Sequence, residues 1–159
     1  YALLLESAND AAVAIAIGLA GSVEAFAFLM NEKAKSLELA DTSFVTPNGL
    51  DAEGHYSTAV DLCKLAAYAE QNSKFVEITN TVSYSFKEIN SGKQYTVNNK
   101  NQFLGMYEGA IGVKTGFTGK AGYCFVGAVN KNDNIITSAV LGSGWPPNKN
   151  YKWSDTKSL

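Results

Sequence analysis

The spacing of apolar residues changes near residue 80, and this change restricts the fold more than any other feature of the sequence. Before residue 80, apolar residues recur every three to four positions, as on one face of a helix. This spacing predicts helices over Ala11–Ala20 and Val23–Leu37, and a third that begins after Ser57. The first helix is apolar almost throughout, which predicts burial on most of its sides.

After residue 80, apolar residues alternate with polar ones, as they do along a strand. Alternation on both sides of Asn90-Ser91-Gly92 predicts a β-hairpin. Three more strands are predicted by apolar runs over Ala110–Phe117, Gly122–Asn130 and Ile135–Leu141. A helix is predicted over residues 150–159. Helices followed by antiparallel strands indicate an α+β fold.

Length, charge and residue types exclude several classes of function. The chain has 159 residues, the size of one domain, and its net charge of −2 argues against a nucleic-acid partner. His55 is the single histidine, so we expect a structural or exposed role for it and no metal site or cofactor. Cys63 and Cys124 have no metal-binding spacing and are expected to be free thiols. No apolar run is long enough to predict a membrane span.

The chain contains no arginine, because all 13 of its basic residues are lysines. It therefore has no planar guanidinium for a carboxylate, and any anion must be held by lysines, hydroxyls or backbone N–H groups. Lys114-Thr115-Gly116 offers all three on a predicted strand, where Lys114 and Gly116 share one face and Thr115 takes the other. Val113 before the lysine excludes a P-loop. Taken alone, this tripeptide also fits a surface lysine before a glycine turn.

Ser7-Ala8-Asn9 precedes Lys114-Thr115-Gly116, and this order of Ser-x-Asn and Lys-Thr-Gly is typical of penicillin-recognising serine enzymes. Residues 108–123 resemble the strand segment of serine-type D-alanyl-D-alanine carboxypeptidases, the low-molecular-mass penicillin-binding proteins. The same resemblance extends to three further segments: residues 42–51, 56–62 and 154–159. It is collinear over nearly the whole chain.

The resemblance implies a partial domain of the penicillin-binding-protein and β-lactamase-like transpeptidase fold over residues 1–159. Residues 1–79 would form its helical part with Ser-x-Asn, residues 80–149 its strand part with Lys-Thr-Gly, and residues 150–159 the start of its closing helix. The implied reaction is attack by a serine on the D-Ala-D-Ala bond of a peptidoglycan stem peptide through an acyl-enzyme. β-Lactams would inhibit the complete domain, and the location would be the bacterial cell envelope, outside the cytoplasm.

The resemblance also implies roles for single residues. Ser7 would relay a proton to the leaving amine, and Asn9 would hydrogen-bond the substrate's peptide group. Lys114 would support Ser7 and attract the terminal carboxylate, which Thr115 would bind. Gly116 would let substrate lie against the strand, and the Phe117 N–H would serve the oxyanion hole.

Several of these residues have simpler interpretations. Ser7, Asn9 and Asp10 are also helix N-cap types and could cap the helix that follows them. Lys100 and Lys152 could help to attract a carboxylate, but ordinary solvated lysines are the expectation for both.

The family's nucleophile lies in a Ser-x-x-Lys motif ahead of Ser-x-Asn, and Ser7 stands too near the first residue for such a motif to precede it. Ser154-Asp155-Thr156-Lys157 matches the pattern at the wrong end of the order, so we reject Ser154 as the nucleophile. We therefore expect these 159 residues to be inactive alone and their sheet to expose an edge and an apolar face. The alternatives are a non-catalytic domain that binds peptidoglycan peptide, a transpeptidase, or a β-lactamase-related hydrolase.

Overall fold

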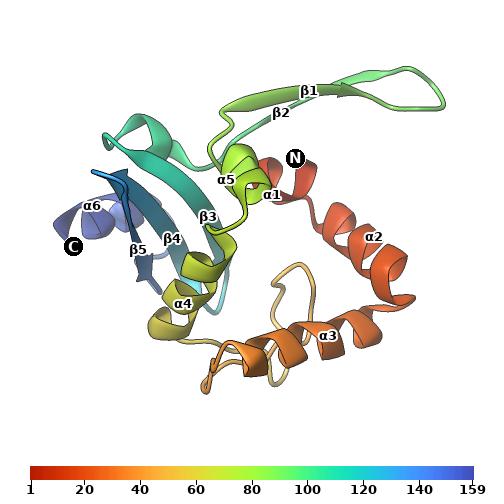
Figure 1. Cartoon of the computed structure of the whole chain (residues 1–159), viewed down its shortest axis with the longest axis horizontal. Coiled ribbons are helices and arrows are strands. Elements are labelled where there is room, and N and C mark those ends of the chain that lie inside the picture. Colours follow the sequence, from red (N-terminus) through yellow and green to blue (C-terminus); the bar gives the residue numbers. More distant parts are fainter.

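A computed structural model describes all residues, 1–159, and confirms the α+β fold. Three helices lead from the N-terminus: α1 (Ala2–Glu6), α2 (Asn9–Ala20) and α3 (Val23–Ser36). Figure 1 shows them following one another in an arc that leads away from α5 and ends below α4. The remaining elements, in chain order, are α4 (Ala59–Ala69), α5 (Ser73–Thr79), β1 (Ser83–Lys87), β2 (Gln94–Asn98), the 3-10 helix η1 (Gln102–Gly105), β3 (Ala110–Thr118), β4 (Gly122–Lys131), β5 (Asn134–Val140) and α6 (Tyr151–Ser158).

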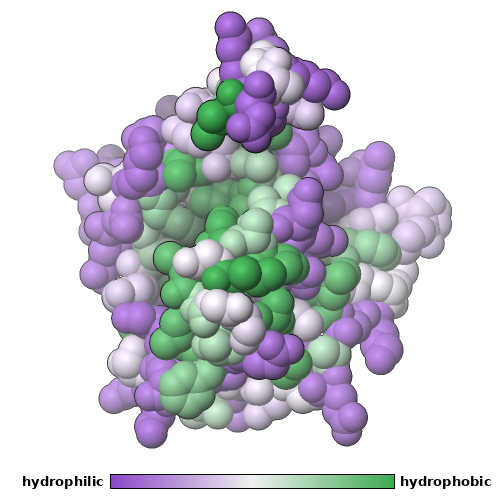
Figure 2. Space-filling view, turned by 90° about the vertical axis from the view of Figure 1, so that its right-hand side faces the viewer, coloured by the Kyte–Doolittle hydropathy of each residue, from purple (hydrophilic) through white to green (hydrophobic).

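The helices largely follow the predicted pattern, with one correction to their burial. Ser22 caps α3, because its hydroxyl accepts a hydrogen bond from the Ala25 N–H. The expectation that α2 is buried on most sides is wrong for this structure, since Ile17 is 50% exposed and Leu19 is 72% exposed. Figure 2 shows an apolar surface on the side of the molecule on which α2 lies in Figure 1.

No single helix of the chain is long and apolar enough to cross a membrane. The pair α2 and α3 meets the length and composition criteria together, but the two helices meet at a bend of 84°.

The loop over residues 40–57 is fixed to the start of α4 by one buried carboxylate. Thr58 caps α4 by accepting the Asp61 N–H. The Asp61 side chain does not return to the cap, as a capping box would require. It accepts hydrogen bonds instead from the Asp41 N–H and the Thr42 hydroxyl, at 2.9 and 2.7 Å. This contact connects the helical part to the sheet, because α4 packs on β5.

The main sheet has three antiparallel strands in the order β3-β4-β5, as the three apolar runs predicted. Its core includes Phe103, Phe125 and Trp153, which bring together η1, β4 and α6. The order leaves one edge of β3 and one edge of β5 without a strand partner, which agrees with the expected open sheet. The free edge of β3 carries the Lys-Thr-Gly motif.

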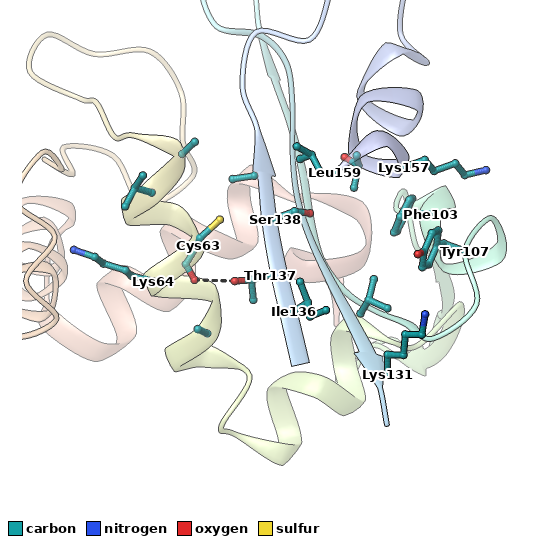
Figure 3. A pocket seen from close by; sticks show the side chains of 16 residues that line it. Cys63, Lys64, Phe103, Tyr107, Lys131, Ile136, Thr137, Ser138, Lys157 and Leu159 are labelled. Atoms are coloured by element: carbon teal, nitrogen blue, oxygen red, sulfur yellow. Dashed lines mark hydrogen bonds between the residues drawn. The ribbon is translucent and has the colours of Figure 1, made fainter. Parts of the chain in front are cut away.

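An apolar groove of about 800 Å³ lies beside the other free edge, between α4, β5 and α6. Figure 3 shows Cys63 and Lys64 on its α4 side and Ile136 and Ser138 on β5. The groove is bridged by one hydrogen bond, from the Thr137 hydroxyl to the Cys63 carbonyl. None of the predicted site residues lines this groove.

The predicted hairpin is present as β1 and β2, which pair with each other and with no other strand. Figure 1 shows this two-stranded ribbon projecting from the body of the molecule, above α1 and α5. The two helices below the ribbon, α1 and α5, were not predicted from the sequence. Both are short, and neither shows the repeated spacing from which a helix is recognised.

Candidate functional site

The Lys-Thr-Gly motif occupies the second half of β3, the strand at the edge of the sheet. Its residues Lys114, Thr115 and Gly116 pair with Val126, Phe125 and Cys124 of β4. The opposite edge of β3 has no strand partner. A ligand along that free edge can reach side chains from both faces of the strand, so Lys114 and Thr115 need not share a face to act together.

Ser7 reaches the site from the junction between α1 and α2. It is the C-cap of α1 and has left-handed backbone angles, with φ 58° and ψ 41°. A non-glycine residue is uncommon in this region, and such residues are often found at functional sites. The turn brings the Ser7 hydroxyl to Lys114, whose ammonium donates a hydrogen bond to it. Two motifs 107 positions apart in sequence are therefore in direct contact.

The capping interpretation of Ser7-Ala8-Asn9 is wrong. Ala8 is the N-cap of α2, and no side chain caps that end of the helix. Asp10 accepts a hydrogen bond only from the adjacent Ala11 N–H. Ser7 is thus available to Lys114, while Asn9 is exposed in the first turn of α2 and lies outside the pocket that Ser7 lines.

Lys114 is enclosed enough to change its acidity. Its ammonium donates a second hydrogen bond, to the Thr115 carbonyl at 2.9 Å, and no carboxylate pairs with it. Burial, together with the smaller effect of the nearby positive charge of Lys100, lowers the pKa of Lys114 to about 8. Such a lysine changes protonation state close to physiological pH, which suits a proton relay as well as an anion site.

A pocket of about 320 Å³ opens next to the Ser7–Lys114 contact, and we call it the Ser7 pocket. It is lined by residues from four parts of the chain: Ser7, Lys100, Thr115, Gly116, Phe117, Tyr123 and Lys152. Two of these side chains are lysines, and Lys114 adds a third positive charge through its contact with Ser7. The pocket is suited to an anion, because it combines these charges with the Thr115 hydroxyl and the β3 backbone.

Lys152 corrects the expectation of a solvated lysine. It is only 7% exposed, and its ammonium donates to the Lys149 carbonyl. The same ammonium lies 4.6 Å from the ring centroid of Tyr123, in cation–π contact. Burial lowers the pKa of Lys152, and Lys149 adds to that effect. No spacing in the sequence reveals this contact, because α6 meets the sheet only in the folded chain.

Lys100 is exposed, as expected, but it also lines the Ser7 pocket. Its ammonium forms an ion pair with Glu6 at 3.3 Å, and Glu6 accepts a hydrogen bond from the Asn98 N–H at the end of β2. These contacts hold the pKa of Glu6 below its ordinary value. They also fasten the base of the hairpin to the helix that carries Ser7.

The structure brings together most of the predicted site residues. Ser7, Thr115, Gly116 and Phe117 line the pocket, and Lys114 contacts Ser7. Sequence analysis did not single out Tyr123, which lines the pocket from β4 and packs against Phe117 with ring centroids 4.4 Å apart. Its place follows from the register of β3 and β4, in which Phe117 and Tyr123 are partners.

The structure also gives the surroundings of the residues that were not predicted to take part in the chemistry. His55 Nδ1 accepts a hydrogen bond from the Val45 N–H at 2.9 Å, which is a structural role within the loop. Cys63 and Cys124 are both free thiols. Ser154 donates its hydroxyl to the Tyr151 carbonyl within α6. No cluster of three or more metal-ligating side chains is present.

Comparison with known proteins gives one consistent result. The profile of the D-alanyl-D-alanine carboxypeptidase family matches residues 1–144. The D-alanyl-D-alanine carboxypeptidase DacF of Bacillus subtilis is 38% identical over 93% of this chain. The crystal structure of the Streptomyces K15 DD-transpeptidase matches 98% of this chain with a TM-score of 0.88 and 33% identity. Penicillin-binding protein D2 of Listeria monocytogenes, solved with cefotaxime bound, matches 99% with a TM-score of 0.84 and 33% identity.

The chain is shorter than each of these relatives. It spans 38% of the length of DacF, 63% of the K15 chain and 62% of the Listeria chain. The similarity therefore covers nearly all of this sequence but only part of each relative.

Proposed function

The chain belongs to the D-alanyl-D-alanine carboxypeptidase family, and from that membership we propose that its Ser7 pocket binds the carboxyl end of a peptidoglycan stem peptide that ends in D-Ala-D-Ala. The observation that carries this proposal is the contact of Lys114 with Ser7 beside a pocket with two further lysines. A terminal carboxylate is the part of this substrate that needs such positive charge. A peptide bond within a longer chain would gain nothing from it.

Each part of the pocket has a task in this proposal. Lys114 and the Thr115 hydroxyl bind the terminal carboxylate, and Lys100 and Lys152 supply the additional charge that relatives with arginine would provide. The free edge of β3 offers backbone groups to an extended peptide, which can add to the sheet as a further strand. Asn9 would hydrogen-bond the substrate's peptide group once substrate is present, since its side chain is exposed and near Ser7 in sequence.

The proposed reaction is serine-type hydrolysis through an acyl-enzyme. The oxygen of a serine hydroxyl adds to the carbonyl carbon of the penultimate D-Ala as its proton passes into the relay that ends at Ser7. The C–N bond then breaks, and Ser7 delivers a proton to the departing amine. Lys114 supports this transfer, because its lowered pKa lets it exchange a proton with Ser7 near neutral pH. The Phe117 N–H contributes to the oxyanion hole, and water then releases the shortened peptide. In this proposal the reaction takes place in the bacterial cell envelope, and β-lactams inhibit it.

We propose that the nucleophilic serine of this reaction is not one of these 159 residues. No Ser-x-x-Lys string precedes Ser7, and Ser154 donates its hydroxyl within its own helix. The polypeptide of 159 residues therefore binds stem peptide without forming an acyl-enzyme.

A chimera tests the proposal most directly. The segment of Bacillus subtilis DacF that precedes its similarity to Tyr1 is joined to these 159 residues, and release of D-Ala from a D-Ala-D-Ala peptide is measured. We expect release from the chimera, none from the 159 residues alone, and a loss of at least about a hundredfold on Lys114→Met, as for other transition-state charge partners. Labelled penicillin should bind covalently to the chimera only.

Two results would count against the proposal. Stoichiometric penicillin labelling of the 159 residues alone would show that they contain a nucleophile. A folded chimera whose D-Ala release is unaffected by Lys114→Met would remove the pocket from the reaction. The matched control is Lys120→Met, which changes an exposed lysine in the turn after β3.

A further inference from the structure

The projecting β1–β2 ribbon has one aromatic side and one polar side. Tyr84 and Phe86 alternate on β1, and Tyr95 stands directly opposite Phe86 on β2. Neighbouring positions point to the other side, where the hydroxyls of Ser85 and Thr96 hydrogen-bond each other at 2.8 Å. We call the side with Tyr84, Phe86 and Tyr95 the aromatic face.

The rings of the aromatic face form a row. Their centroids are 6.4 Å apart between Tyr84 and Phe86 and 5.8 Å apart between Phe86 and Tyr95, with planes inclined by 26° and 21°. Tyr1 extends the row, since its ring stacks on Tyr84 at 3.6 Å. The three ribbon rings remain 36–41% exposed, although aromatic rings in a soluble chain are ordinarily more deeply buried.

The aromatic face begins close to the Ser7 pocket. Tyr1 and Ser7 stand at opposite ends of α1, about 9 Å apart along the helix axis at 1.5 Å per residue. The second strand of the ribbon, β2, ends at Asn98, and Lys100, two residues later, lines the pocket. A few residues of extended peptide, each about 3.4 Å long, would bridge from the pocket to the row of rings.

We propose that the aromatic face binds the sugar chain to which the stem peptide is attached. The inference rests on the proposed function, because the ligand is the polymer that carries that peptide. A pyranose ring presents C–H groups on its faces and hydroxyls at its rim. It can therefore lie on an aromatic ring while its hydroxyls meet the phenol groups of Tyr84 and Tyr95.

The dimensions of the ribbon favour a narrow ligand over a protein partner. Five residues per strand give a face about 17 Å long and about 10 Å wide. That area is on the order of 200 Å², well below the roughly 800 Å² per partner of a stable protein interface. A second copy of the chain would find too little surface here, whereas a single glycan strand needs no more.

The side chains of the face favour sugar over lipid. Within β1 and β2 its exposed members are rings, two of which carry hydroxyls, and its one aliphatic member, Val97, is only 9% exposed. The exposed aliphatic side chains near the ribbon, Val82 and Ile89, stand outside the two strands. The ends of the strands carry Lys87 and Lys93 with Glu88 between them in sequence, not a cluster of like charge. A surface built for anionic lipid would combine aliphatic bulk with several uncompensated lysines.

The test measures binding of the 159-residue chain to two separate probes. One is a soluble N-acetylglucosamine oligomer without peptide, and the other is a free D-Ala-D-Ala peptide without sugar. We expect Phe86→Val and Tyr95→Val each to weaken oligomer binding roughly two- to tenfold, the effect of losing one aromatic contact. Valine keeps the β-propensity of the strand, so the ribbon should persist. Peptide binding should not change.

The matched control is Ser85→Val, the same new side chain on the opposite side of the same strand, which should leave oligomer binding intact. The proposal is overturned if the wild-type chain does not bind the oligomer, if Ser85→Val weakens binding as much as Phe86→Val, or if the ribbon variants abolish binding to lipid vesicles or self-association instead. Peptide binding without oligomer binding would remove this inference alone. Loss of peptide binding in the wild-type chain would contradict the proposed function.

Discussion

Lys114 combines a positive charge with partial burial, and this combination makes ligand binding depend on pH. Its pKa is lowered to about 8 from the ordinary 10.5, so the protonated fraction falls as the pH rises above 8. Only the protonated form attracts a carboxylate. We therefore expect the affinity for a D-Ala-D-Ala peptide to be constant below about pH 7 and to fall by up to tenfold per pH unit above 8. Calorimetric titration across this range measures it.

A control peptide tests whether this pH dependence arises from the attraction between Lys114 and the terminal carboxylate. With its terminal carboxylate converted to an amide, the peptide should bind more weakly and without that pH dependence. An affinity that stays flat up to pH 10 for the free acid would contradict the role of Lys114.

The contacts of single residues were predictable only where a family pattern named them. Ser7 and Lys114 were paired by the order of two motifs, although their spacing of 107 residues carries no geometric information. Lys152 was taken for a solvated lysine, because a lysine in a short polar helix gives no local sign of burial. Its contact with Tyr123 arises from packing of the last helix against the sheet.

At the scale of secondary structure, three elements meet around a buried carboxyl group. Glu70 at the end of α4 is 6% exposed, and neither of its oxygens has a hydrogen-bond partner. A Cβ added to Gly112 of β3 would lie 3.4 Å from this carboxyl and 3.0 Å from the Thr79 hydroxyl of α5. Burial raises the pKa of Glu70, and no charged neighbour contributes.

This carboxyl group should make stability fall with rising pH. The contribution of Glu70 to the free energy of unfolding is fully present below its ordinary pKa of about 4.5. It is lost as the pH rises through the raised pKa of the folded state, because the folded protein then holds a buried charge. Glu70→Gln removes the ionisation. Urea unfolding should show a smaller loss of stability between about pH 5 and pH 8 in Glu70→Gln than in the wild type. Equal losses in the two proteins would refute the assignment, and Glu53→Gln, at an exposed loop position, serves as the control.

The turn that joins β3 to β4 depends on Gly122. Its φ is +71°, and an added Cβ would lie 2.8 Å from the Gly144 carbonyl oxygen and 2.9 Å from the Trp145 ring. Gly122→Ala should therefore lower the free energy of unfolding by about 1–3 kcal/mol, from backbone strain and overpacking. Gly119→Ala in the same turn has open space and an ordinary φ, and should change stability little. Thermal unfolding of both variants measures this difference, and equal midpoint temperatures for the two variants would refute the prediction.

Elements with strong periodicity were predictable from sequence, and those defined by long-range packing were not. Alternation identified the two strands of the hairpin, and continuous apolar runs identified the three strands of the main sheet. The short helices α1 and α5 have too few turns for a periodic signal. The apolar composition of α2 predicted burial correctly for Ala12 and Ala16 but not for its exposed Ile17 and Leu19.

On the scale of the whole molecule, the free edge of β3 forms part of the Ser7 pocket, whereas the largest apolar groove lies beside the other free edge of the sheet, that of β5. The groove between α4 and α6 and the exposed side chains of α2 and α3 are apolar, and the outer edge of β5 is unpaired. The Ser7 pocket combines lysines, hydroxyls and the β3 backbone. Peptide binding should therefore be separable from acylation in these 159 residues.

An NMR titration with a D-Ala-D-Ala peptide tests that pocket most directly. With the chain labelled in nitrogen-15, we expect the largest shifts at the amides of Ser7, Thr115, Gly116 and Phe117, and we expect Lys114→Met or amidation of the peptide to abolish them. The opposite result would be shifts confined to the groove between α4 and α6, or shifts at the Ser7 pocket that persist without Lys114 and without the terminal carboxylate.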